Sequence, residues 1–117
     1  MAKIAILAGE PSGDLIASQL MAYVGSKVKN IEFVGVGGPL MKKQGLRSFF
    51  DYSNLSLYGV FQVIPNIPKL IFLRFKLINY LKNEKPDIFI GVDAPDFNFY
   101  VEKKLKLRGI PTFHYVA

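Results

Sequence analysis

The chain has 117 residues, 50% of them apolar, and its 15 Lys and Arg against 9 Asp and Glu give a formal net charge of +6. This length suits one domain with a real core and is short for a complete enzyme that acts on two substrates. The lack of Cys excludes a disulfide framework and a thiolate metal site, and the basic surface favours an anionic partner, although charge also serves solubility.

Apolar runs alternate with helical patterns along the chain. The apolar runs at 3–8, 31–36, 88–92 and 112–116 are predicted strands. Stretches with helical spacing at 14–24, 68–83 and 97–108 are predicted helices. This alternation predicts βαβ crossovers, and therefore an α/β fold with a parallel sheet and helices on both faces. Loops that follow strands gather at one edge of such a sheet, so we expect 9–12, 35–39 and 93–96 to converge.

The turn after the first predicted strand has the features of a ligand-binding loop. Gly9 permits a tight turn, and Ser12 can accept hydrogen bonds from the free amides of the first helical turn. Gly9 and Gly13 lack the Gly-x-Gly-x-x-Gly spacing of the dinucleotide fingerprint. Glu10 and Asp14 would repel a phosphate, so the turn is expected to hold sugar hydroxyls or an amide. A turn that only caps the helix is the alternative.

An apolar stretch in the middle of the chain covers more of a helix circumference than one core contact would use. Basic residues break the run, so it is not a transmembrane helix, and Pro65 and Pro68 are expected to interrupt regular structure. A basic, apolar, interrupted segment is typical of an interfacial membrane anchor, whereas a packed crossover helix with snorkelling lysines is the alternative. The residues predicted to contact a membrane are Phe61, Val63, Ile64, Ile67, Lys69, Leu70, Ile71, Arg74 and Lys76.

Two carboxylates, Asp93 and Asp96, follow the third predicted strand. Neighbouring carboxylates can have their pKa values driven apart, which suits one of them to act as a general base. In the simpler interpretation, Asp96 caps the helix that begins near Phe97 and Asp93 holds a loop amide. The single His114 is expected to be structural, and no metal site is predicted because one His cannot form one alone.

Five different motifs follow one another along the chain at a distinctive spacing. They are Gly-Glu-Pro-Ser-Gly-Asp at 9–14, Gly-Val-Gly-Gly-Pro at 35–39, Leu-Tyr-Gly-Val at 57–60, Gly-Val-Asp-Ala-Pro-Asp-Phe-Asn at 91–98 and Gly-Ile-Pro-Thr-Phe-His-Tyr-Val at 109–116. In this order they resemble the amino-terminal domain of the lipid-A-disaccharide synthase family, glycosyltransferases of Gram-negative lipid A assembly. The resemblance covers the chain from Ile4 to Ala117. Its most specific parts are the first and fourth motifs.

The resemblance implies a Rossmann-like domain at 1–117 that forms the amino-terminal, acceptor-side half of a GT-B type glycosyltransferase. The nucleotide-sugar domain would follow it, so we expect the chain alone to be inactive. The implied reaction condenses UDP-2,3-diacylglucosamine with 2,3-diacylglucosamine 1-phosphate into a β-1,6-linked disaccharide plus UDP, with inversion and without a cofactor. Asp93 is implied as the base. The residues expected to bind substrate are Gly9, Glu10, Ser12, Gly13, Asp14, Gly37, Gly38, Asp96 and Asn98.

The family also implies a cytoplasmic protein bound peripherally to the anionic inner face of the inner membrane. Two alternatives stay open: a non-catalytic membrane-surface module, and a Rossmann-like nucleotide-binding domain of another enzyme class that uses Gly35 to Gly38 for pyrophosphate. The second is weakened because that segment follows the second predicted strand and lacks the fingerprint spacing. Nucleic acid is not an expected partner, since no nucleic-acid motif accompanies the positive charge.

Overall fold

Within the residues that the structure describes, five parallel strands form one sheet. The computed structural model describes residues 2–49, 63–92 and 95–115. In chain order the elements are β1 (Ala2–Ala8), α1 (Pro11–Lys27), β2 (Ile31–Val36), α2 (Pro39–Lys43), β3 (Leu46–Ser48), α3 (Val63–Glu84), β4 (Ile88–Val92), α4 (Pro95–Lys106) and β5 (Thr112–Tyr115). The strands lie in the order β3-β2-β1-β4-β5, and each neighbouring pair is parallel.

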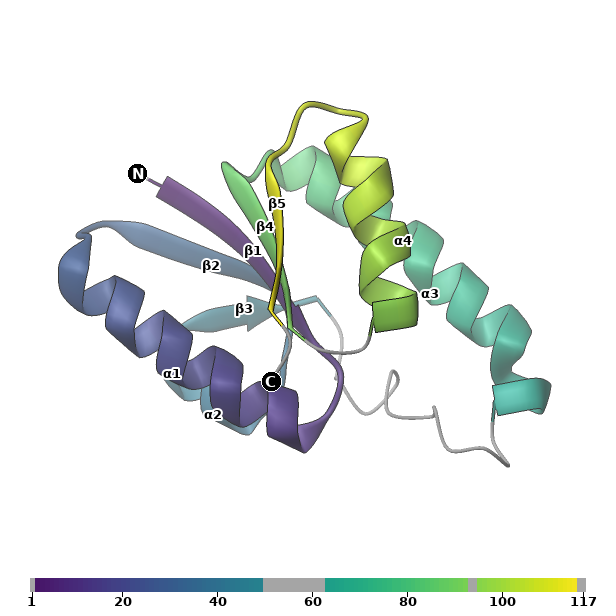
Figure 1. Cartoon of the computed structure of the whole chain (residues 1–117), viewed down its shortest axis with the longest axis horizontal. Helices are drawn as coiled ribbons and strands as arrows, with labels where there is room; N and C mark the ends of the chain where they lie inside the picture. The colour runs from purple at the N-terminus through teal and green to yellow at the C-terminus, as the bar shows by residue number, and fades with distance from the viewer. Residues whose placement is uncertain (1, 50–62, 93–94, 116–117) are drawn as a thin grey trace.

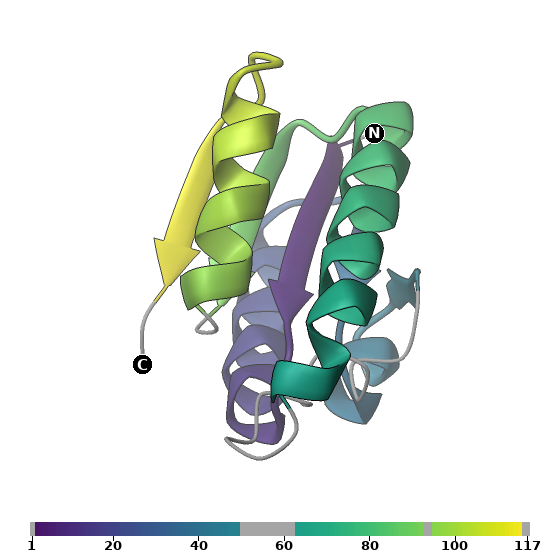
Figure 2. The same cartoon turned by 90° about the vertical axis from the view of Figure 1, so that its right-hand side faces the viewer.

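Helices cover both faces of this sheet. From β1 in the middle, the chain first winds outward through α1 and α2 to β2 and β3, and later passes through α3 to β4 and β5 on the other side of β1. As a result, α1 and α2 lie on one face and α3 and α4 lie on the opposite face (Figure 1 and Figure 2). This doubly wound, Rossmann-like arrangement confirms the predicted fold class.

Side chains of β1 alternate between two hydrophobic cores. Ala5 and Leu7 face α3 and α4, while Ile6 and Ala8 face α1 and α2. The core under α3 and α4 consists of Ala5, Leu7, Val34, Val36, Leu77, Ile78, Leu81, Phe89, Val101 and Leu105. The core under α1 and α2 consists of Ile6, Ala8, Ala17, Met21, Phe33, Met41, Leu46 and Val92. Because both faces of the sheet are covered, its central strand is apolar on both sides.

Gly35 in β2 occupies a position that only glycine fits. Its φ is +139°, and a β-carbon built there would lie 2.1 Å from the backbone oxygen of Ile6 in β1. The register pairs these two residues, so a side chain at this position would push into the neighbouring strand. The glycine therefore permits the pairing of β1 with β2.

The first helix begins earlier than predicted. It starts at Pro11 rather than at residue 14, because proline has no amide hydrogen to lose at the first helical position and its φ is already helical. Glu10 is the residue before the helix, and no side chain caps this end. The prediction that Ser12 caps the helix is therefore wrong: Ser12 lies inside its first turn.

The later helices also differ from the predictions at their starts. α3 begins at Val63 and runs through Pro65 and Pro68, so the prediction that these prolines interrupt regular structure is wrong. Pro65 lies in the first turn, whose amides have no helical acceptor, so it removes no helical hydrogen bond, whereas Pro68 lies in the second turn and removes one without ending the helix. α4 begins at Pro95, which places Asp96 in the first turn rather than at the cap. The short elements α2 and β3 were not predicted.

A network of ion pairs joins the starts of β1 and β2 to β3 and to the end of α3. The Lys3 Nζ lies 2.9 Å from Glu84 Oε1 and 3.9 Å from Glu32 Oε2. The Arg47 guanidinium contacts both of these carboxylates. The hydrogen bond from Lys3 holds the pKa of Glu84 below its ordinary value. This carboxylate therefore stabilises the fold at neutral pH, and its contribution is lost as the pH falls through the lowered pKa.

Candidate functional site

The carboxyl ends of β1, β2 and β4 meet at one edge of the sheet (Figure 1). The direction of winding reverses between β1 and β4, because the chain leaves β1 toward β2 on one side and reaches β4 on the other. Ligands of open α/β sheets bind at such a switch point. The loops expected to converge at this edge therefore occupy the position of a ligand site.

The turn between β1 and α1 presents polar groups at this edge. Gly9 and Gly13 are buried, whereas Glu10 and Ser12 are exposed. A β-carbon at Gly13 would lie 3.3 Å from Ala8 Cβ, so the first turn of α1 packs closely on the end of β1. Within the described ranges, no acceptor pairs with the backbone amides of Ser12 and Gly13, which are free first-turn donors. These amides and the Glu10 carboxylate offer both donors and an acceptor to a polar ligand.

Asp14 joins the turn after β1 to the loop after β2. Its Oδ1 accepts the backbone amides of Gly38 and Met41, and its Oδ2 accepts that of Leu40, each at 3.0 Å. The side chain is 2% exposed. The three donors belong to the start of α2, whose own preceding residue has no side chain. Asp14 therefore caps α2 from α1, and its assignment as a substrate contact stays a prediction.

The same carboxylate occupies the position at which the start of α2 would attract an anion. A diphosphate held by residues 35–38 would lie against this buried negative charge, which disfavours the nucleotide-binding alternative. The Gly37 amide lies 3.4 Å from Ser48 Oγ, and a β-carbon at Gly37 would lie 2.3 Å from Met41 Sδ. Gly37 thus lets the loop fold tightly onto α2 and β3, while the substrate contacts predicted for Gly37 and Gly38 stay predictions.

The end of β4 lies beside the turn that follows β1. The backbone oxygen of Val92 would be 3.7 Å from a β-carbon on Gly13. Asn98, in α4, is fully buried, and its Nδ2 lies 3.4 Å from the same oxygen, so it holds the start of α4 against the strand. Asp93 and the side chain of Asp96 fall outside the described residues. The roles predicted for Asp93, Asp96 and Asn98 toward substrate stay predictions.

His114 joins β5 to α4. Its Nδ1 lies 2.8 Å from Glu102 Oε2, and the two side chains are 11% and 12% exposed. Gly91, which pairs with His114 in the sheet, leaves the space for this contact, because a β-carbon there would lie 2.7 Å from the same Glu102 oxygen. The pair packs within the layer formed by the sheet and α4, as a structural histidine would.

One hollow of the molecule lies away from the candidate site, and the described residues contain no metal-binding group. A hollow of about 640 Å³ is lined by the end of α1, the start of β2 and the turn before β3, so it lies at the opposite edge of the sheet. Among residues 2–49, 63–92 and 95–115, no group of three His, Asp or Glu side chains is placed to hold a metal ion.

The surface of α3 carries exposed aromatic and basic side chains. Phe72 and Phe75 are 57% and 54% exposed, and the Lys76 ammonium lies 4.7 Å from the centre of the Phe72 ring. Arg74 is only partly exposed, and its guanidinium stacks 4.7 Å from the ring of Tyr100 in α4. The sequence analysis did not single out Phe72 and Phe75, although their alternation with basic residues was a usable signal.

The other residues predicted to contact a membrane are described only in part. Phe61 lies outside the described residues. Six residues lie in α3, but their side chains are outside the description: Val63, Ile64, Ile67, Lys69, Leu70 and Ile71. None of the helices in the described part combines the length and the apolar character needed to cross a bilayer.

Comparisons with known proteins agree over almost the entire chain. The family model for Lipid-A-disaccharide synthetase matches residues 4–117. The lipid-A-disaccharide synthase of Idiomarina loihiensis is 50% identical over 98% of this chain and 30% of that protein. The synthase of Pseudomonas fluorescens is 47% identical over 98% of this chain and 31% of its own length. The synthase of Methylobacillus flagellatus is 44% identical over 100% of this chain and 31% of its own length.

The chain thus spans less than a third of the length of the curated relatives that it matches. Among solved structures, MurG of Acinetobacter baumannii matches with a TM-score of 0.65 over 99% of this chain and 34% of that chain. The identity is 15%, so this likeness shows the fold alone. It agrees with the doubly wound arrangement of the sheet.

Proposed function

This chain belongs to the lipid-A-disaccharide synthase family, and we propose that it forms the amino-terminal, acceptor-side part of an inverting GT-B type glycosyltransferase of lipid A assembly. The family match over residues 4–117 carries the proposal. The curated relatives are more than three times as long as the matched segment. The proposal therefore assigns the nucleotide-sugar site mainly to a carboxy-terminal domain.

The proposed reaction joins two acylated glucosamines by a β-1,6 bond. A hydroxyl of 2,3-diacylglucosamine 1-phosphate attacks the anomeric carbon of UDP-2,3-diacylglucosamine from the face opposite UDP. The new C–O bond forms as the bond to UDP breaks, so the configuration inverts in one displacement. Asp93 accepts the proton of the attacking hydroxyl, and such general base catalysis contributes about 10²–10⁴ in rate.

The described residues support an acceptor-binding role for this domain. The switch point brings the end of β4, which Asp93 follows, next to Gly13 in the turn after β1. The free amides of Ser12 and Gly13 and the exposed Glu10 carboxylate suit sugar hydroxyls, which both donate and accept hydrogen bonds. The Asp14 carboxylate at the start of α2 disfavours a diphosphate there, as expected if UDP binds mainly to the other domain.

We expect the 117-residue chain to bind UDP with a Kd above about 1 μM (roughly −8 kcal/mol) and to show no glycosyl transfer. The physical reason is that this domain offers no free anion position at α2. Calorimetric titration with UDP and a transfer assay measure both properties. A protein that contains this chain and the carboxy-terminal part found in its relatives should transfer the sugar; if it does not, the proposed function is wrong. A Kd for UDP at or below about 1 μM for the chain alone would contradict the assignment of the nucleotide-sugar site to the carboxy-terminal domain.

We also propose that the protein acts on the inner face of the inner membrane, because its substrates would be acylated. Phe72, Phe75 and Lys76 on α3 form the described part of the membrane-contacting surface. Aromatic rings that insert at the headgroup level, with a lysine beside them, bind anionic lipid by apolar burial and charge together. Arg74 contributes less than predicted, since its guanidinium stacks on Tyr100.

Replacing Phe72 and Phe75 together by Ser should lower binding to phosphatidylglycerol vesicles by more than about tenfold, because two half-exposed rings lose their burial in lipid (roughly 1.4 kcal/mol or more). Sedimentation with vesicles measures this, and phosphatidylcholine vesicles should bind weakly throughout. The matched control replaces Leu15 and Tyr23 together by Ser. These two side chains are 48% and 63% exposed and lie on α1, which covers the opposite face of the sheet from α3. An equal loss in the control, or a large drop in melting temperature for the Phe pair, would rule the surface out.

A further inference from the structure

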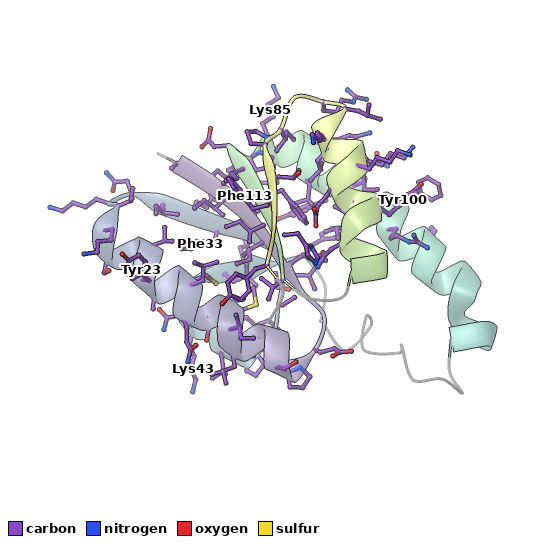
Figure 3. All side chains as sticks on the ribbon, viewed as in Figure 1. Tyr23, Phe33, Lys43, Lys85, Tyr100 and Phe113 are labelled. Carbon is purple, nitrogen blue, oxygen red and sulfur yellow. The ribbon has the colours of Figure 1, made fainter. Side chains whose placement is uncertain are left out.

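Three cationic side chains surround a small hollow at the edge of the sheet opposite the candidate site. The hollow has a volume of about 250 Å³ and is lined by Lys82, Lys85, Pro86, Arg108 and Ile110. Lys82 comes from the last turn of α3, Lys85 from the loop before β4, and Arg108 from the loop before β5. Figure 3 shows Lys85 projecting from this end of the molecule, far from Lys43 on α2.

The positive charge of this hollow is not balanced by the described protein groups. No carboxylate lines it. Within residues 2–49, 63–92 and 95–115, none of Lys82, Lys85 and Arg108 forms an ion pair, whereas Lys3 and Arg47 near the same edge are paired with acidic side chains. Like charges around one small space repel one another unless an anion lies among them.

The backbone brings Lys85 to the hollow in a conformation that usually belongs to glycine. Its φ is +51°, and its amide donates to the Leu81 oxygen at 3.1 Å, so it closes the end of α3 as a left-handed cap. α4 ends in a related way at Gly109, whose φ is +80°. A lysine at such a position strains the backbone where a glycine would not, and it adds a charge beside the hollow.

We propose that this hollow binds a phosphate monoester group, carried by a soluble metabolite or by a lipid headgroup. Arg108 offers a planar pair of N–H donors that can bind two phosphate oxygens at once, and the two lysines add point charges. A doubly charged monoester neutralises most of the charge that the three side chains gather. The site lies at the opposite edge of the sheet from the proposed catalytic loops and does not depend on the proposed function.

The test with a soluble probe titrates the chain with inorganic phosphate and follows backbone amide resonances. Saturable shifts should centre on residues 82–87 and 107–110. Lys85→Gly, Lys82→Gln and Arg108→Gln should each weaken binding about fivefold, because one cation about 4 Å from an anion in water is worth that factor. Lys85→Gly should not lower the melting temperature, since glycine adopts the same φ without the strain that lysine carries there. Lys43→Gln removes the same charge elsewhere and should leave the affinity unchanged.

Vesicles distinguish the two sources of the phosphate group. If the site takes a lipid headgroup, the protein should bind vesicles with phosphatidic acid more tightly than vesicles of equal charge with phosphatidylglycerol, and Lys85→Gly should remove the preference. Weakened binding of inorganic phosphate by the variants without any vesicle preference assigns the site to a soluble phosphate ester. The proposal is overturned if the shifts do not saturate, or if the three variants bind phosphate as the unaltered chain does. The cations would then serve only to offset the negative ends of α3 and α4.

Discussion

Asp93→Asn should lower kcat by about 10²-fold or more in a protein that joins this chain to the carboxy-terminal part of its relatives. Asparagine has nearly the shape of aspartate but cannot accept the proton of the attacking hydroxyl. The substrates should still bind, so the loss should fall on kcat rather than on KM. Release of UDP at saturating substrate concentrations measures the effect.

The matched control is Asp96→Asn, three residues further along the chain. Asp96 lies in the first turn of α4, where a carboxylate stabilises the helix through its dipole. Its replacement should therefore change kcat much less than that of Asp93. Equal impairment of the two variants, or an Asp93→Asn enzyme close to wild type, would show that the proton acceptor has been assigned to the wrong residue.

Gly35→Ala should prevent the chain from folding stably, at a cost of more than about 4 kcal/mol. The added β-carbon would lie 2.1 Å from the backbone oxygen of Ile6, and neither strand can move away without breaking the pairing of β1 with β2. The expected result is a chain without a cooperative thermal transition by circular dichroism, or one recovered only in insoluble form.

Gly25→Ala is the control for this glycine. Gly25 lies inside α1, and a β-carbon there would meet nothing within 4 Å. Alanine favours helix over glycine by about 1 kcal/mol, so this variant should melt at a slightly higher temperature. A Gly35→Ala chain that melts as cooperatively as the unaltered protein would mean that β1 and β2 tolerate a wider separation than the structure shows.

The three central strands, β1, β2 and β4, were predictable because most of their side chains are buried on both faces of the sheet. β2 and β4 match the predicted ranges in full, and β1 differs from its prediction by one residue at its start. The short elements α2 and β3, of 5 and 3 residues, are too brief to show a period. Proline at the first position of α1 and α4 was a signal that could have corrected the predicted starts of these two helices, and Pro39 could have pointed to the start of α2.

The position of the candidate site in the fold was predictable from the sequence, but the contacts within it were not. Loops that follow parallel strands share an edge, so the position of the turn at 9–14 followed from the order of the elements. The role of Asp14 did not, because its partners lie 24 to 27 residues further along the chain. Local patterns carry no information about such distant amides, nor about which of two neighbouring acidic residues becomes buried.

The cap that Asp14 supplies has a consequence for the thermodynamics of binding. α2 has 5 residues, too few to persist as a helix without outside support. The bonds to Asp14 fix its start to α1 when the chain folds, so the loop after β2 is ordered before any ligand arrives. The conformational entropy of that loop is lost during folding and does not weaken later binding. A ligand that binds at this edge therefore meets two loops that are already ordered. The entropy cost of binding then comes mainly from the ligand itself.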